Sequence, residues 1–254
     1  MKKLLIFIII FIYSIEINGR EIGQTEITAE DGVEVFQDEK YYLLKKNVKI
    51  ESDNFVLTGD LIKIYFEEDL YDIKIIDAKG KANLQSNAHN IIAVGDELYF
   101  IIDQEKIIIN GLGSNLITDN IKMLSDGKIE VNNLNGDFNL FGKNSSIETE
   151  NIIVIGKKID GVFVPGSTTN EIALLNVEDK KIAYVKSDGT EMFANRIKYN
   201  KKTSIIELEE NVKIIDESET VTGDYGTINS NTNSYKIRSK ETKRVKVIIS
   251  NSDE

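Results

Sequence analysis

Apolar and polar side chains alternate along most of the chain beyond residue 20. Between Asn47 and Ile50, two apolar side chains alternate with two polar ones, and successive side chains of a strand leave opposite faces of a sheet. The segment 61–66 keeps this period of two and places three apolar side chains on one face: Ile62, Ile64 and Phe66. We find about fifteen such segments and no helical periodicity after residue 20, which predicts an all-β fold of antiparallel strands.

One motif within this pattern occurs twice. The tetrapeptide Asn-Val-Lys-Ile at residues 47–50 is followed, after seven residues, by Thr-Gly-Asp at residues 58–60. The same seven residues recur 164 positions later, at 211–214 and 222–224. Self-similarity at a fixed spacing is the signature of repeated structural units. The chain is therefore predicted to contain copies of one β-unit.

The Gly-Asp pair that closes each motif predicts a turn or a bulge, since glycine tolerates a positive φ and aspartate hydrogen-bonds to its own backbone. Weaker versions occur as Gly-Asp at 95–96 and as Ala-Asn at 194–195, each followed by alternating apolar residues. The first two of these four sites are 36 residues apart and the last two are 29 apart. Unequal spacing favours a meander of strands that vary in length over a strictly periodic solenoid.

The single proline, Pro165, lies between the two halves that carry the motif. Because proline cannot donate a hydrogen bond to a sheet ladder, it marks a candidate boundary. This predicts a first β-unit at 20–165 and a second at 166–254, or one continuous sheet with a surface loop at the proline. With 254 residues and 41% hydrophobic content, either arrangement can bury a core.

The N-terminal residues carry a targeting pattern. Lys2 and Lys3 precede an apolar run at 4–13, which polar residues follow, and this order is typical of a secretory signal peptide over residues 1–19. We expect cleavage after Gly19. The apolar run is shorter than the roughly twenty residues that a helix needs to span a bilayer, and an uncleaved inner-membrane anchor is the alternative. The absence of cysteine excludes disulfides and an acylated-cysteine lipoprotein.

The formal net charge is −11, and an acidic surface disfavours nucleic acid as a partner. Positive charge is concentrated in one stretch near the C-terminal end, where six cationic side chains occur: Lys236, Arg238, Lys240, Lys243, Arg244 and Lys246. Lysine and arginine on an exposed edge strand block unwanted pairing. The cluster therefore predicts either edge protection or contact with an anionic head group or an acidic partner.

Few residues suited to catalysis are present. The chain has one histidine, His89, in a predicted polar turn, and no cysteine, so nucleophilic triads and zinc sites of the usual kind lack their side chains. The aspartates of the Gly-Asp pairs are isolated, unlike the dense repeats of calcium-binding β-proteins. We therefore expect no catalytic residue, metal or cofactor. Two of the 42 acidic residues could still serve glycoside hydrolysis, which leaves a carbohydrate-active exported β-protein as an alternative.

Three segments are apolar on both faces of their predicted strands: 107–109, 152–155 and 247–249. Such strands belong to the core of a sandwich or present an outer face to something hydrophobic. A sheet folded onto itself also leaves a slot between its layers. A slot lined by isoleucine, leucine and phenylalanine suits acyl chains, at about 0.8 kcal/mol per methylene removed from water. These residues favour an exported, non-catalytic β-protein that binds lipid.

The repeated motif, the alternating residues after it and the segment Ile-Asp-Ala-Lys-Gly-Lys-Ala at 76–82 resemble the OstA-like domain of the lipopolysaccharide-transport bridge proteins, the LptA family. The segment at 27–35 is similar to the opening of that domain. The resemblance covers roughly residues 27–110 and 183–237, whereas residues 111–182 match the pattern poorly. The poor match implies either extra rungs or two OstA-like units joined at the proline.

The resemblance implies a periplasmic, stacked antiparallel β-jellyroll shaped like a folded taco, with repeated OstA-like units. Proteins of this family hold the acyl chains of lipopolysaccharide (lipid A) in an apolar groove and pass them from the inner to the outer membrane. Edge-strand pairing joins them to an inner-membrane-anchored protein and an outer-membrane β-barrel, and the same edges allow head-to-tail self-association. An inner-membrane-anchored LptC-like partner is the alternative within the same pathway.

Carried onto this sequence by alternation, the resemblance implies a groove lined by twelve lipid-binding side chains. Eight belong to the first copy of the motif: Val48, Ile50, Leu57, Ile62, Ile64, Phe66, Leu98 and Phe100. Four belong to the second copy: Ile197, Tyr199, Val212 and Ile214. Each of them is also suited to an ordinary hydrophobic core.

Overall fold

The computed structural model describes residues 21–68, 72–87, 90–165, 170–217, 219–232, 234–240 and 244–250. These ranges form eighteen β-strands and no α-helix, so the all-β prediction is confirmed. Within the same ranges, no helix is long and apolar enough to cross a membrane. The signal peptide predicted at 1–19, His89 and Lys243 lie outside the described residues.

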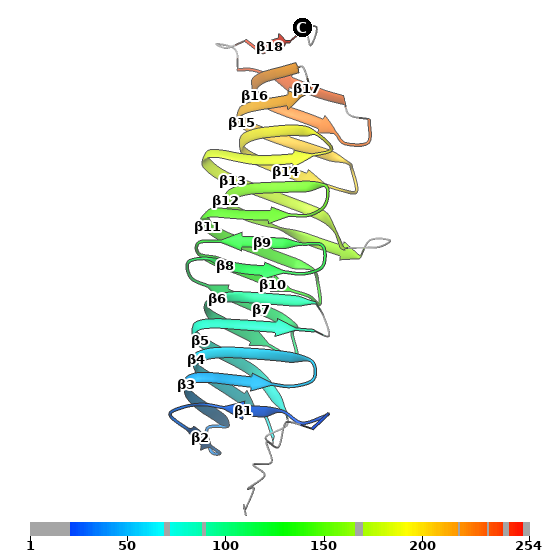
Figure 1. The fold of residues 1–254 in the computed structure, drawn as a ribbon. Helices are drawn as coiled ribbons and strands as arrows, with labels where there is room; N and C mark the ends of the chain where they lie inside the picture. The colour runs from blue at the N-terminus through cyan, green and yellow to red at the C-terminus, as the bar shows by residue number, and fades with distance from the viewer. Residues whose placement is uncertain are drawn as a thin grey trace, which may run out of the picture.

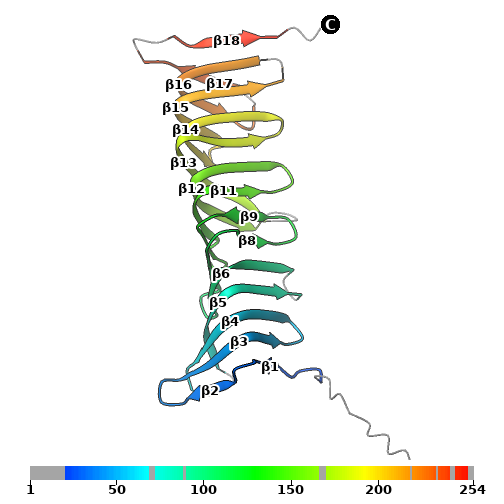
Figure 2. The same ribbon diagram turned by 60° about the vertical axis from the view of Figure 1, so that its left-hand side comes forward.

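The strands pair antiparallel in one sheet, which forms an elongated stack with the first and last strands at opposite ends (Figures 1 and 2). In chain order they are β1 (Glu26–Thr28), β2 (Val33–Phe36), β3 (Tyr41–Glu51), β4 (Phe55–Phe66), β5 (Ile73–Ser86), β6 (Ile91–Ile101), β7 (Lys106–Asn110), β8 (Ser114–Ile117), β9 (Lys122–Ser125), β10 (Lys128–Asn132), β11 (Asp137–Glu148), β12 (Ile152–Pro165), β13 (Asn170–Ser187), β14 (Thr190–Asn200), β15 (Ile205–Asp216), β16 (Glu219–Asn229), β17 (Ser234–Arg238) and β18 (Lys246–Ile249).

The long strands shift register near their middle, for example between Lys45 and Val48 in β3 and between Glu209 and Val212 in β15. At this point each strand bends, so the sheet folds over and every long strand contributes one half to each of two layers. We call the line of bends the crease and the opposite, open side the mouth. Layer A contains β2, β7, β10, β17 and the halves of long strands that pair with them, and layer B contains β1, β8, β9, β18 and the other halves.

We call each level of the stack, which crosses both layers, a rung. A rung is either one long bent strand or two short strands that separate at the crease. Four rungs are of the second kind: β1 with β2, β7 with β8, β9 with β10, and β17 with β18. Together with the ten long strands they make fourteen rungs in the described part of the chain. At about 4.8 Å per strand spacing, the stack is roughly 60 Å long.

The segments on either side of Pro165 belong to the same sheet. Pro165 is the last residue of β12 and pairs with Asn170, the first residue of β13. The rungs from β7 to β13 account for residues 111–182, where the sequence matches the repeated motif poorly. The stack thus carries extra rungs there, and the sheet has no break at the proline.

The glycines of the Gly-Asp pairs lie inside the crease, where the two layers approach each other. A Cβ atom at Gly95 would lie 2.5 Å from Cγ2 of Ile109, and one at Gly59 would lie 3.2 Å from the carbonyl oxygen of Lys79. Gly59, Gly95 and Gly223 are not among the residues with positive φ. The prediction that these glycines serve a left-handed backbone is therefore wrong, because their function is to leave space.

Positive φ occurs instead on the alternate strands of the crease, for example at Glu210 and Asn211, with φ of 66° and 56°. The aspartates of the Gly-Asp pairs bind these neighbouring bends. Asp96 Oδ2 accepts a hydrogen bond from the backbone N–H of Leu112 at 3.2 Å, and Asp224 Oδ2 accepts one from that of Lys240 at 3.0 Å. In these two pairs the carboxylate therefore binds the bend of the next rung, a contact between rungs that the sequence did not predict.

Candidate functional site

The interior between the two layers is lined by continuous rows of apolar side chains that run along the stack. Each row is a chain of directly paired residues, one from each successive rung. The row of layer A that lies nearer the crease, the A core row, contains Leu44, Ile62, Ala78, Leu98, Ile109, Ile129, Leu140, Ile159, Val177, Ile197, Leu208, Gly226 and Ile237.

A second row of layer A, the A mouth row, lies two residues farther from the crease. It contains Tyr42, Ile64, Ile76, Phe100, Ile107, Val131, Phe138, Gly161, Leu175, Tyr199, Ile206, Ile228 and Tyr235. Because side chains alternate between faces with a period of two, both rows point into the fold.

Layer B contributes a third row, the B row, from the first rung to the last. It contains Ile27, Ile50, Leu57, Leu84, Ala93, Leu116, Met123, Ile147, Val154, Val185, Met192, Ile214, Val221 and Val247. No charged residue interrupts any of the three rows. The two layers therefore share one apolar interior along the whole described stack.

The structure brings all twelve predicted lipid-binding side chains to this interior. Nine belong to the three rows, Phe66 lies beside the A mouth row, and Val48 and Val212 lie at the crease. Ten of the twelve are buried, and Phe100 and Tyr199 are partly exposed. Most of these side chains therefore pack against the protein itself, and their contact with lipid stays a prediction.

Size and exposure change across the interior from crease to mouth. At the crease, small residues pair with one another, including Ala183 with Ala194 and Ser114 with Ser125. The A core row is closed from Leu44 to Gly226, with Ile129 and Leu140 among its fully buried members. The A mouth row is partly open to solvent at Gly161 and at six side chains: Tyr42, Phe100, Ile107, Val131, Tyr199 and Tyr235. The accessible apolar surface of the interior thus lies at the mouth.

Aromatic side chains are concentrated on the layer A side of the mouth. The rings of Tyr42 and Phe66 are 5.6 Å apart, and those of Phe138 and Phe163 are 4.4 Å apart. The sequence interpretation missed the second pair, because it transferred groove positions only from the two copies of the motif. The alternation of Phe138 and Leu140 with polar residues is the signal that could have found it.

The apolar rows end in exposed side chains at both ends of the stack. On the first rung, Val33 and Val35 are 48% and 46% exposed, and on the last rung Val247 is 50% exposed. Both rungs present a strand edge that has no partner within the described part of the chain. Such edges can pair with a strand of another chain.

The two ends differ in charge. Five of the six basic side chains predicted as a contact site are described, and all five are exposed on or beside the last rung: Lys236, Arg238, Lys240, Arg244 and Lys246. The first rung instead carries Glu34 and, at its crease, Glu30. Hydrogen bonds from Asn47 and Lys46 lower the pKa of Glu30. Within the chain, Glu34 pairs with Lys45 at 2.6 Å and Glu30 with Lys46 at 3.1 Å. The ends of the stack thus differ in charge, with an excess of basic side chains at the last rung and paired carboxylates at the first.

Tyr235 links the two layers at the last rung. Its side chain comes from layer A, and it forms a hydrogen bond with Glu219 at the start of β16 in layer B. Burial, together with this carboxylate, raises the pKa of Tyr235 to about 12. The mouth is therefore bridged by a polar contact at this end of the stack.

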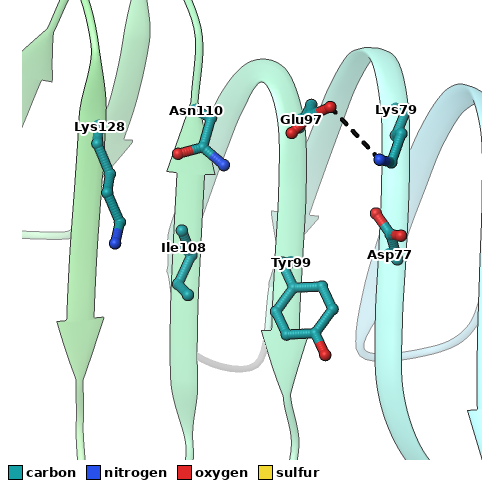
Figure 3. Close-up of a pocket in the computed structure, with 7 residues that line it drawn as sticks. All are labelled: Asp77, Lys79, Glu97, Tyr99, Ile108, Asn110 and Lys128. Carbon is teal, nitrogen blue, oxygen red and sulfur yellow. Dashed lines mark ion pairs between the residues drawn. The ribbon is translucent and has the colours of Figure 1, made fainter.

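The outer face of layer A carries a shallow polar depression of about 350 Å³ (Figure 3). Its lining residues come from neighbouring strands: Asp77, Lys79, Glu97, Tyr99, Ile108, Asn110 and Lys128. Lys79 and Glu97 form an ion pair at 3.5 Å across it. No group of three potential metal ligands occurs among the described residues. The depression has the character of a solvated sheet face, and it lies on the opposite side of layer A from the interior.

Comparison with solved structures gives several similarities. Among them, the crystal structure of LptH from Pseudomonas aeruginosa, described as the LptA homologous periplasmic component of the lipopolysaccharide transport device, matches with 14% identity and a TM-score of 0.42. The match covers 52% of this chain and 95% of that chain. No family model and no curated protein matches the sequence.

Proposed function

We propose that this chain is a non-catalytic periplasmic bridge that holds the acyl chains of lipopolysaccharide and passes them from the inner toward the outer membrane. The observation that carries the proposal is the set of three rows without a charged residue that line the interior, of which the B row runs from the first rung to the last and the two A rows from the second. A hydrocarbon chain needs no directional contact, so a continuous apolar surface is sufficient to bind it at any point along the stack. The resemblance of the repeated motif to the OstA-like domain supports the same function.

The acyl chains would enter at the mouth. Phe100, Ile107 and Tyr199 retain exposed apolar surface there, whereas the A core row behind them is closed. Each methylene that leaves water for this surface contributes about 0.8 kcal/mol, so several chains together bind firmly without a polar contact. The sugars of the same molecule would remain outside in water.

Edge pairing at the two ends would extend the bridge. The last rung runs from layer A to layer B and the first rung runs from layer B to layer A, so two copies joined end to end continue the antiparallel order. The rows then align: Ile237 meets Val33 of the next copy and Tyr235 meets its Val35. On the outer face, Lys236 meets Glu34. The same edges suit an inner-membrane-anchored protein and an outer-membrane β-barrel.

Photo-crosslinking tests the lipid contact. Phe100 and Tyr99 are adjacent in β6 and point to opposite faces of layer A, so a photoreactive phenylalanine analogue at either position gives a matched pair. The chain is produced with its own N-terminal segment, and crosslinking is carried out in a cell envelope that contains lipopolysaccharide. We expect a lipopolysaccharide adduct at position 100 and none at position 99.

Equal adduct at both positions, or none at position 100 in a folded protein, would contradict the proposal. A second pair of variants, Phe100→Asp and Tyr99→Asp, checks binding without a crosslinker. We expect the first to lose bound lipopolysaccharide and the second to keep it. Thermal unfolding of both variants shows whether the loss comes from the site or from the fold.

The N-terminus separates the bridge from the membrane-anchored alternative. Intact-mass measurement on the protein from its native envelope reports whether the chain begins near Arg20 or retains Met1. We expect the shorter form, in the fraction released without detergent. Retention of Met1 in the membrane fraction would favour the anchored LptC-like protein.

End-to-end pairing has its own test. We expect Lys236→Glu to reduce end-to-end association of the purified chain, because it places two carboxylates side by side across the junction. Glu34→Lys should do the same alone and restore association when both substitutions are present. If all three variants associate end to end as strongly as the wild type, the proposed strand register at the junction is excluded.

A further inference from the structure

The outer face of layer B carries fewer charged side chains than the outer face of layer A along most of the described stack. One row of directly paired residues on this face is uncharged over nine rungs: Thr58, Asn83, Val94, Asn115, Leu124, Ser146, Ile155, Tyr184 and Phe193. The row beside it contains Val56, Gln85, Ile92, Ile117, Lys122, Glu148, Ile153, Lys186, Glu191 and Ile215. We call these two rows the B strip.

The charged residues of the B strip neutralise one another. Lys122 and Glu148 lie on neighbouring strands with Nζ and Oε2 3.9 Å apart, and Lys186 lies 3.5 Å from Glu191. By contrast, the corresponding rows of layer A carry a charged residue on most rungs. They include Lys63, Asp77, Lys79, Glu97, Lys128, Glu130, Lys158, Asp160, Glu178, Arg196, Lys198, Glu207 and Glu209.

Large apolar side chains of the B strip face solvent. Ile155 is 44% exposed, and the rings of Tyr184 and Phe193 lie next to it in the same row, 5.0 Å apart. Burial raises the pKa of Tyr184, with a further contribution from Glu191. A contiguous exposed apolar area on a protein surface marks an interaction site.

We propose that the B strip is a dimer interface, on which a second copy of this chain packs face to face. Nine strand spacings of about 4.8 Å and a half-strand of about 13 Å give roughly 550 Å² per copy, or roughly 1,100 Å² in total. This area is at the lower limit for a specific interface, which predicts a weak dimer. Aligned packing of two sheets about 10 Å apart accommodates such a contact.

Charge complementarity favours a second copy over another partner. Lys122 in β9 and Glu148 in β11 lie on adjacent rungs at the middle of the B strip. A two-fold axis parallel to the strands and between these rungs reverses the rung order, so Lys122 meets Glu148 of the other copy and Ile117 meets its Ile153. The contact is isologous, as a two-fold interface requires. A negatively charged lipid surface suits the B strip less well, because the carboxylate of Glu148 beside Lys122 would face the lipid phosphates as well.

The first test compares two apolar side chains of equal exposure on opposite layers. Ile155 is 44% exposed on the B strip, and Leu174 is 43% exposed on the outer face of layer A. Sedimentation equilibrium of the full exported chain should show a closed dimer. We expect Ile155→Arg to raise the dimer dissociation constant at least about tenfold and Leu174→Arg to leave it unchanged.

The second test reverses charges at the two-fold axis. Lys122→Glu and Glu148→Lys, each alone, should weaken the dimer because they place like charges opposite each other across the interface. The double variant should restore it. Thermal unfolding of the single variants separates this effect from a change in the monomer, where the same two side chains are neighbours.

Closed dimers are distinguishable from end-to-end chains, because a two-fold contact stops at two copies whereas a head-to-tail contact continues. This proposal is independent of the proposed transport function, and Lys236→Glu should leave the face-to-face dimer intact. A monomer at all concentrations, or equal behaviour of Ile155→Arg and Leu174→Arg, would overturn it. Binding of the B strip to phosphatidylglycerol vesicles by a chain that remains monomeric would overturn it as well.

Discussion

The crease and the mouth are two regions of one interior, and they differ in what an inward-facing side chain does. At the crease, Gly95 leaves no room for even one more carbon, because a Cβ there would lie 2.5 Å from Ile109. At the mouth, inward positions of the same sheet hold large side chains such as Phe100 and Tyr199, which keep part of their surface exposed. An inward-facing side chain near the bend therefore packs against the protein itself. Only an inward-facing side chain far from the bend is accessible to a ligand.

This difference shows how a folded sheet can contain both a core and a binding surface. The small residues and aspartate contacts of the crease fix the distance between the layers, and this distance closes the A core row. The layers are connected only at the crease and through side chains, so the mouth is where they can separate. A lipid that enters the mouth would displace water and weak contacts without disturbing the crease.

The largest effect is expected at the crease itself. Gly95→Val places a β-branched side chain against Ile109 and against the carbonyl oxygen of Asn110, which a Cβ would approach to 2.9 Å. Overpacking of this kind costs about 1–3 kcal/mol, and here backbone is one of the obstacles, so we expect the upper end or failure to fold. Chemical denaturation of the variant measures the loss.

A glycine outside the crease provides the control for this substitution. Gly189, in the hairpin between β13 and β14, has nothing within 4 Å of its Cβ position, although its φ of 85° makes a side chain strained. Gly189→Ala should therefore cost only about 1 kcal/mol. A Gly95→Val protein as stable as the wild type would show that the layers are not held at the distance described here.

The second prediction compares two isoleucines of one strand. Ile109 and Ile107 both belong to β7 and both point inward, but Ile109 is fully buried in the A core row and Ile107 lies in the partly open A mouth row. Ile109→Ala should cost about 2–5 kcal/mol, and Ile107→Ala clearly less, because a half-exposed site loses fewer contacts and leaves no closed cavity. Urea denaturation of both variants gives the difference. Equal losses would mean that the mouth is as closed as the core.

The third prediction concerns the aspartate contacts that hold the crease. Asp96→Ala removes the acceptor of the Leu112 N–H at 3.2 Å, and we expect a loss of about 0.5–1.5 kcal/mol, the net contribution of one hydrogen bond, because water can reach this exposed donor. Glu97→Ala, the next residue, removes only an exposed ion pair with Lys79 and should change stability by less than about 0.5 kcal/mol. Chemical denaturation of both variants gives their free energies of unfolding. If Asp96→Ala and Glu97→Ala are equally stable, the aspartate has no structural function at the crease.

How much of this could be predicted from sequence differs between the two regions. Alternation with a period of two fixes which side chains share a face, and it placed all twelve predicted groove residues in the interior. It does not fix the distance between the layers. That distance depends on the conformation of the bends, so the closure of the A core row and the access at the mouth were not predictable from the pattern.

The Gly-Asp motif shows the same limit. The sequence identified it as a turn or bulge, and it does lie at the bend of the sheet, but the glycine has another function there than predicted, and the contact of the aspartate was not predicted. The aspartate binds a residue of the following rung, as Asp126 Oδ1 does with the N–H of Asn144 at 3.2 Å. Such a contact between rungs becomes visible only when the register is known. In the middle of the chain Ser125 replaces the glycine, which is why the motif escaped notice there.

The smallest effect is expected at the mouth, where Tyr235 meets Glu219 across the two layers. Burial and the nearby carboxylate raise the pKa of Tyr235 to about 12, so the folded protein favours the protonated phenol. This contribution to stability is fully present below the unfolded value of about 10 and is lost as the pH rises through about 12. A spectrophotometric titration should show one tyrosine that ionises near that upper value, and Tyr235→Phe should remove it. In Glu219→Gln the same tyrosine should ionise at a lower pH but still above its ordinary value, because burial is the larger cause of the shift. If no tyrosine of the wild type titrates late, the two layers are not in contact at this end, and the mouth is open there.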